Sequence, residues 1–359
     1  MSGQAALETF VRSIPLFSLV EPGEMMDILR LLRPVQLEPG QVLFREGEPG
    51  RAMWICSAGV EVSLSTTPSG AKRPIAVAYA RAGDVVGEMA LVDDGARSAS
   101  AVVVGGGHAH EVLAQDFHAL RDAFHPAAFK VLRRLSLDLC KRLRATNDRI
   151  VAPAPAQIST PPVPAKARPG AEVLDTFPAF KPLPAVVKLA LAQKLQLIEV
   201  DGVTPLFAEG EPGDGAYFLL SGEVSVGRNG KTLANLVPGT MIGLVAAIDA
   251  GTRSASCITT GPATLLKLSA RDFDALFAAH HRFAFQLVDL VARQLVSHLR
   301  QANAMLPLPG KTSGAAASAR PMTQLLHAPA DPEADLEVLP LELEMEVQDE
   351  VQLMGELLS

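Results

Sequence analysis

The chain contains the same ordered set of short motifs twice, and this internal repeat constrains its fold more than any other feature. The string EGEPG occurs at 46–50 and again at 209–213, and RSAS occurs at 97–100 and again at 253–256. Between the two motifs, each copy has a glycine followed by valines that alternate with polar residues. Two homologous domains therefore follow one another in the chain.

The two copies differ in length by seven residues. The EGEPG strings are 163 positions apart, whereas the RSAS strings are 156 positions apart. We place the missing residues in the turn at 66–73, which corresponds to a shorter turn at 228–231. Loops between strands accept a change of length at the least cost.

Each copy has the pattern of a small β structure framed by helices. Helical entries are expected at 22–32 and 186–193, before many short strands separated by Gly and Pro. The segments 60–64 and 223–226 alternate with the period of two that is typical of strands. The pattern predicts a mainly β fold with flanking helices, as in a sandwich or jelly roll.

A long closing helix is expected at the end of each copy, because apolar residues recur there at helical spacing. They are Val131, Leu132, Leu135, Leu139 and Leu143 in the first copy, and Val288, Val291, Leu295 and Leu299 in the second. Such a stripe can pack on the sheet of its own domain. It can equally form an interdomain contact or a homodimer through the closing helices, and the sequence leaves these alternatives open.

We expect domains at 1–150 and 177–303, joined by a linker at 151–176 and followed by a disordered acidic tail at 304–359. Residues 151–170 are rich in Pro and Ala, which is typical of an extended linker. With 359 residues, of which 48% are hydrophobic, the chain is long enough to build two cores.

The acidity of the chain belongs to the tail. From residue 331 on there are ten Asp or Glu and no Lys or Arg, and without those ten carboxylates the net charge of −7 becomes +3. Four apolar residues of the tail share one helical face: Val347, Val351, Met354 and Leu358. The tail is therefore either a solvated acidic segment or a short helix that folds on a protein partner.

The segment GEMALVDDGARSAS at 87–100 combines the groups that recognise a sugar phosphate. The carboxylate of Glu88 can accept a hydrogen bond from a ribose hydroxyl, and the guanidinium of Arg97 can bind phosphate oxygens as a fork. Gly87 lets the backbone approach closely, and the amides of a helical turn from Met89 onward favour an anion. The alternative interpretation is a surface turn with an incidental ion pair, which contributes little.

This segment resembles the phosphate-binding cassette of cyclic nucleotide-binding domains, found in kinase regulatory subunits and catabolite activator proteins. The resemblance implies that each copy is a β jelly roll with a closing helix, that Glu88 holds the ribose 2′-hydroxyl and that Arg97 holds the cyclic phosphate. It adds five further residues to the first site: Gly87, Met89, Ala90, Ser98 and Ala99. Ser98 after the arginine favours cyclic AMP as the ligand, with cyclic GMP as the alternative.

The second copy has a degenerate cassette. Gly243 lies opposite Gly87 and Arg253 opposite Arg97, but Leu244 replaces Glu88. A hydrogen bond to a charged group contributes about 1.5–3 kcal/mol, so this site should bind a cyclic nucleotide weakly or not at all. The pair Arg253 and Ser254 can still hold another anion, or Arg253 can pair with an acid in the fold.

No pattern in the chain predicts catalytic residues or a metal site, and we expect no enzyme. The string GHAHE at 107–111 offers two histidines and a glutamate, but three glycines precede the first histidine. We therefore expect a turn there. The second copy has no histidine at that place.

DNA binding is not expected, because nothing after about residue 303 has the pattern of a helix-turn-helix and an acidic tail repels phosphates. We expect the basic residues of the first closing helix to form a solvated face. They are Lys130, Arg133, Arg134, Lys141, Arg142 and Arg144.

A cytoplasmic protein without a membrane segment is expected. No apolar run approaches the roughly 20 residues of a membrane span, and the N-terminus lacks the pattern of a signal peptide. Cys56 and Cys257 lie in strand-like runs, where we expect buried, reduced thiols.

Two functions follow from these observations. The first is a cyclic nucleotide receptor that regulates a signalling partner. The second is an interaction scaffold that senses nothing and docks a partner through its acidic tail.

Overall fold

The computed structural model describes residues 3–67, 74–152, 163–165, 167–279 and 281–306. These residues divide into two compact units. The first unit comprises the chain up to Ile150 and the end of helix α8 (Arg282–Ala304) from Leu295 on, and the second runs from Val151 to Gln294. The acidic tail, its candidate docking helix and much of the predicted linker lie outside the described residues.

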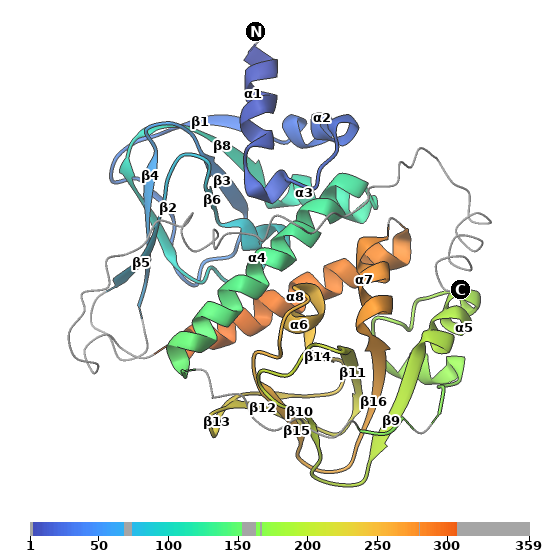
Figure 1. The fold of residues 1–359 in the computed structure, drawn as a ribbon. Coiled ribbons are helices and arrows are strands. Elements are labelled where there is room, and N and C mark those ends of the chain that lie inside the picture. The colour runs from blue at the N-terminus through green and yellow to red at the C-terminus, as the bar shows by residue number, and fades with distance from the viewer. Residues whose placement is uncertain (1–2, 68–73, 153–162, 166, 280, 307–359) are drawn as a thin grey trace. The chain divides into compact units, whose positions relative to one another are not determined.

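In the first unit, two four-stranded antiparallel sheets enclose an apolar core (Figure 1). The first sheet has the order β1-β8-β3-β6 and the second β2-β7-β4-β5. The strands are β1 (Arg33–Leu37), β2 (Val42–Phe44), β3 (Ala52–Cys56), β4 (Glu61–Thr66), β5 (Ile75–Ala80), β6 (Val85–Val86), β7 (Ser100–Gly105) and β8 (Gly107–Leu113). The helices are α1 (Gly3–Arg12), η1 (Pro15–Phe17), α2 (Pro22–Arg30), η2 (Glu88–Leu91), α3 (Ala114–Asp122) and α4 (Pro126–Ile150).

The second unit repeats this arrangement with sheets β9-β16-β11-β14 and β10-β15-β12-β13. Its strands are β9 (Leu195–Val200), β10 (Pro205–Phe207), β11 (Gly215–Ser221), β12 (Val224–Arg228), β13 (Lys231–Leu236), β14 (Met241–Ile242), β15 (Ser256–Thr259) and β16 (Ala263–Ser269). Its helices are η3 (Ala171–Thr176), α5 (Ala185–Lys194), α6 (Leu244–Ile248), α7 (Ala270–Ala278) and the first part of α8. Residues 171–176, which we expected at the end of the linker, thus form a helical turn whose Leu174 is buried.

The structure confirms the repeat and the place of the length difference. Strand β5 begins 156 positions before β13, whereas β4 begins 163 positions before β12, so the seven extra residues lie between β4 and β5. In the second copy this connection is a tight turn in which Asn229 and Gly230 both have positive φ angles. This pair of angles is typical of a two-residue hairpin.

Helices α4 and α8 are the predicted closing helices, and all the apolar residues of their stripes are buried. The predicted solvated face of α4 is wrong for most of its basic residues. Lys130 is buried and bonds Glu21 and Glu24, Arg134 pairs with Asp138, and Lys141 alone of the six basic residues is exposed. Lys130 and Arg142 bond carboxylates of other elements of the unit, whereas Arg134 bonds a carboxylate of its own helix.

His108 and His110 lie on strand β8, so the prediction of a turn at 107–111 is wrong; the chain turns just before this strand, where Gly106 separates β7 from β8. Within the described part of the chain, no helix combines the length and the apolar character needed to cross a membrane.

All three cysteines are buried: Cys56 in β3, Cys140 in α4 and Cys257 in β15. Burial raises the pKa of the Cys56 thiol to about 12, with a further contribution from the charge of Asp84, and burial raises that of Cys257 to about 12. Since the thiolate is the reactive form, we expect a thiol reagent at mildly alkaline pH to leave the folded chain unmodified and to titrate all three thiols after denaturation. Rapid modification of the folded chain would contradict this burial.

Candidate ligand-binding site

The first cassette begins where strand β6 ends. Gly87 has a φ of 83°, in the left-handed region that favours glycine, and directs the chain from the strand into the 3-10 helix η2. A Cβ atom at this position would lie 2.6 Å from Nη1 of Arg97, so the guanidinium occupies the space that a side chain would need. The glycine is therefore required both for the turn and for the guanidinium.

All seven residues assigned to the first site line one pocket. These are Gly87, Glu88, Met89, Ala90, Arg97, Ser98 and Ala99. Strand β2 contributes Phe44, strand β4 contributes Leu64 and helix α4 contributes Arg142.

Arg97 is held in this pocket by neutral groups. Its side chain is buried, with 8% of the residue exposed, and its Nη1 and Nη2 donate hydrogen bonds to the carbonyls of Gly87 (3.0 Å) and Ala52 (2.5 Å). The guanidinium carbon lies 4.0 Å from the centre of the Phe44 ring. These two bonds use two of the five N–H donors of the guanidinium, and the buried Nε has no hydrogen-bond partner among the described residues.

Burial lowers the pKa of Arg97, and the charges of Glu88 and Glu48 oppose this effect. An arginine stays protonated in proteins even with a lowered pKa. No carboxylate hydrogen-bonds it among the described residues. A buried cation that is held only by carbonyls and an aromatic ring favours an anion as the missing partner.

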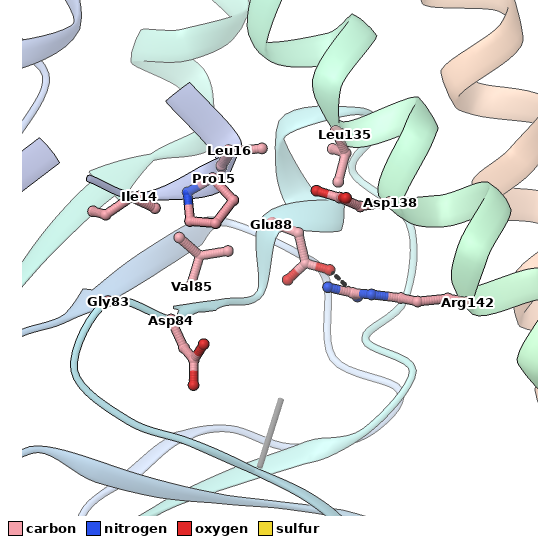
Figure 2. A pocket seen from close by; sticks show the side chains of 10 residues that line it. All are labelled: Ile14, Pro15, Leu16, Gly83, Asp84, Val85, Glu88, Leu135, Asp138 and Arg142. Atoms are coloured by element: carbon pink, nitrogen blue, oxygen red, sulfur yellow. Dashed lines mark hydrogen bonds and ion pairs between the residues drawn. The ribbon is translucent and has the colours of Figure 1, made fainter. Parts of the chain in front are cut away.

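Glu88 faces the same pocket from the start of η2 and is 3% exposed. Its Oε1 accepts a hydrogen bond of 2.5 Å from Nη1 of Arg142 on α4. Figure 2 shows the two side chains facing each other, with Asp138 one turn earlier on the same helix. A second, smaller cavity behind Glu88 is lined by Asp84 and by the N-terminal residues Ile14, Pro15 and Leu16.

Asp138 adds a third carboxyl group to the lining of this smaller cavity. Burial raises its pKa, and the charges of Arg134, Arg142 and Lys141 oppose that shift. Its Oδ1 accepts a hydrogen bond from Arg134 at 2.9 Å. Asp84, Glu88 and Asp138 all line one cavity, and Arg142 lines it as well. Arg142 forms an ion pair with Glu88 there.

Arg142 was not predicted as a site residue, because its position on the closing helix placed it in the expected solvated face. The repeat contains a signal that could have found it. The residue 156 positions after Arg142 is His298, and the residue 156 positions after Glu88 is Leu244. Both members of the ion pair are thus replaced in the copy that lost the glutamate.

Arg300 was missed as well. It lies in the end of α8 that belongs to the first unit, and it lines the pocket. Its Nη1 and Nη2 pair with the carboxylate of Asp93 at 2.7 and 2.8 Å, and its Nε donates to the carbonyl of Ala96. This bidentate pair holds the loop that leads from η2 to Arg97.

Ser98 is half-buried, and its hydroxyl lies 3.9 Å from the sulfur of Met89. The bond is weak, because a thioether is a poor acceptor. The hydroxyl can therefore exchange this contact for a better acceptor or donor in a ligand.

The second cassette has the same backbone and a different charge arrangement. Gly243 has a φ of 79°, and Nη1 of Arg253 donates to its carbonyl at 3.1 Å. Leu244 is buried where the first copy has Glu88, and Ser254 follows Arg253 just before β15. Nη2 of Arg253 bonds Oδ1 of Asp214 at 2.5 Å, so of the two alternatives for Arg253 the structure has the pairing with an acid.

Both copies are similar to one family of known proteins. A family model described as "Cyclic nucleotide-binding domain" matches residues 34–124 and 199–280. Over 132 residues the chain is 31% identical to a CRP-like cAMP-activated global transcriptional regulator of Mycobacterium tuberculosis. The aligned region covers 34% of this chain and 58% of the regulator. Over 93 residues it is 33% identical to a cAMP-dependent protein kinase regulatory subunit of Emericella nidulans, covering 26% of this chain and 21% of that subunit.

The chain thus spans less than two thirds of the length of these curated relatives. Among solved structures, it is similar to the regulatory domain of Toxoplasma gondii PKA with cAMP, with 20% identity and a TM-score of 0.32, over 83% of this chain and 98% of that one. It is also similar to a cyclic nucleotide-binding domain from Methylobacillus flagellatus, with 24% identity and a TM-score of 0.34, over 40% and 84% of the two chains.

Proposed function

We propose that this chain, whose two repeats belong to the cyclic nucleotide-binding domain family, is a signalling protein that binds one cyclic AMP molecule in its first repeat. The observation that carries the proposal is the pair Arg97 and Glu88. One pocket contains a buried cation to which no carboxylate is hydrogen-bonded among the described residues, and a buried carboxylate. A cyclic phosphate needs the first and a ribose hydroxyl needs the second.

Helix α4 is the element through which the ligand would act. Arg142 on this helix bonds the carboxylate that the ribose hydroxyl would use, so ligand and helix compete for Glu88. Binding then favours a placement of α4 in which Arg142 has another partner. A ligand shifts such an equilibrium only by its difference in affinity for the two placements.

The chain acts in this proposal as a regulator and not as an enzyme. The relatives that it matches include a transcriptional regulator and a kinase regulatory subunit by name. The downstream partner is a protein, and the acidic tail is the segment that we propose for docking it. A chain without residues 336–359 should keep its ligand affinity and lose that partner in a pull-down.

Calorimetric titration of the full chain with cyclic AMP tests the proposal, because it yields affinity and stoichiometry together. We expect one site per chain, and weaker competition by cyclic GMP. Absence of heat, together with no competition by either nucleotide in a displacement assay, would favour the interaction scaffold. Two equally tight sites would contradict the assignment of the ligand to the first repeat alone.

Replacement of Gly87 by alanine should lower the affinity for cyclic AMP by about tenfold or more, because the new Cβ displaces Nη1 of Arg97. Gly47→Ala is the matched control. Gly47 has a φ of 85°, and a Cβ there meets nothing within 4 Å. Both variants place an alanine in the left-handed conformation, which destabilises each fold by about 1–2 kcal/mol. The Gly47→Ala variant should keep its affinity for cyclic AMP. Equal affinities of the two variants would show that Gly87 serves only the turn.

A further inference from the structure

We propose that Asp214 is the internal counter-anion of Arg253 and closes the second repeat to phosphate ligands, so that this domain folds and works without a ligand. The inference deepens the proposed function, since it rests on the meaning of the cassette in the first repeat. It concerns a residue outside the cassette that decides which of the two arginines is available to a ligand.

The two arginines are held alike except for one atom. Each Nη1 donates to the carbonyl of the cassette glycine, and each guanidinium carbon lies 4.0 Å from the centre of a phenylalanine ring, Phe44 or Phe207. Nη2 of Arg97 bonds the neutral carbonyl of Ala52, whereas Nη2 of Arg253 bonds the carboxylate of Asp214. The guanidinium of Arg97 thus bonds no anion within the fold and can bind an anionic ligand, whereas that of Arg253 already bonds a carboxylate.

The repeat shows that this carboxylate is a feature of the second copy. Position 214 corresponds to Arg51, 163 positions earlier, and the backbone carbonyl of each accepts the amide at the start of the following helix, from Ala114 or Ala270. The strand register places Glu111 of the first copy at the position of Lys267. The first copy therefore has arginine and glutamate where the second has aspartate and lysine.

Lys267 keeps Asp214 in place and charged. Its ammonium bonds Oδ2 of Asp214, while Arg253 takes Oδ1. Burial would raise the pKa of Asp214, but the hydrogen bonds and charges of Lys267 and Arg253 outweigh burial and lower it. Arg253 is 2% exposed, so its guanidinium is covered while this pair is formed. With Leu244 also unable to accept a ribose hydroxyl, both contacts that a cyclic nucleotide needs are missing.

Thermal unfolding in phosphate tests the role of Asp214 without any nucleotide. The parent is the full chain with Arg97→Gln, a substitution that removes binding of phosphate by the first repeat. It is compared with the chain that carries both Arg97→Gln and Asp214→Ala. Inorganic phosphate is the probe, against sodium chloride at equal ionic strength. We expect phosphate at about ten times its Kd to raise the Tm of the Asp214→Ala chain by about 3 °C and to leave the parent unchanged.

Two controls make the result specific. Asp274→Ala removes an exposed carboxylate of the same unit and should give no phosphate response. Arg253→Gln, added to Asp214→Ala, should abolish the response. Asp214→Asn, which keeps the size of the side chain, replaces Asp214→Ala if that chain does not fold.

An equal phosphate response of the parent, or a response that survives Arg253→Gln, would overturn the proposal. Absence of a response in both the alanine and the asparagine variants would overturn it as well. Failure of the unmodified chain to bind cyclic AMP would refute the proposed function. It would not change the conclusion on Asp214, because the phosphate experiment contains no nucleotide.

Discussion

Replacement of Arg97 by glutamine is expected to lower the affinity of the chain for cyclic AMP by a factor of about a hundred or more. The neutral amide cannot supply the charge for the phosphate, and a hydrogen bond to a charged group contributes about 1.5–3 kcal/mol. Two such bonds in a fork therefore correspond to at least about a hundredfold in the dissociation constant. Titration with cyclic AMP, or displacement of a fluorescent analogue, measures the loss.

The second repeat provides the matched control. Arg253→Gln removes an equivalent arginine that already bonds Asp214, and it should change neither affinity nor stoichiometry. Arg97 also connects the carbonyls of Gly87 and Ala52, so thermal unfolding must show that the Arg97 variant is folded. Arg97→Lys keeps the charge but loses the fork, and an intermediate affinity is expected. A folded Arg97→Gln chain with unchanged affinity would exclude this residue as the phosphate ligand.

Replacement of Glu88 by leucine makes the first cassette resemble the second, and we expect it to weaken binding of cyclic AMP by about 10- to 150-fold. The leucine cannot accept the ribose hydroxyl, which then lies buried without a partner. The same titration measures the change. Glu61→Leu, at an exposed ion pair with Arg81 on a strand of the same unit, should leave the affinity unchanged.

A second substitution separates ligand binding from folding. Glu88→Leu leaves Arg142 half-buried without its carboxylate, and such loss of one partner destabilises a fold. Glu88→Leu/Arg142→His reproduces the pair of residues in the second copy. We expect it to regain part of the lost free energy of unfolding and none of the lost affinity. Recovery of affinity in the double variant would show that Glu88 acts only through Arg142.

The sequence predicted the repeat, the fold and the position of the cassette, because each depends on local patterns. The alternation of β4 and β12 and the helical stripes of α4 and α8 follow from the chain order of apolar residues. The seven-residue difference lies in the turn where we placed it, since a hairpin can lengthen outside the core. The cassette residues lie within one stretch of 13, so a common pocket required only a strand, a turn and a return strand.

The role of each charge depended on contacts between distant segments. Arg142 and Lys130 have the helical spacing of a solvated face, yet their partners Glu88, Glu21 and Glu24 lie 54 to 109 positions away. The partner of Arg253 is Asp214, 39 positions earlier on the chain. The electrostatic free energy of an ionised side chain depends on its distance to other charges and on its exposure to water. Chain folding sets those distances, and no periodicity of the sequence records them.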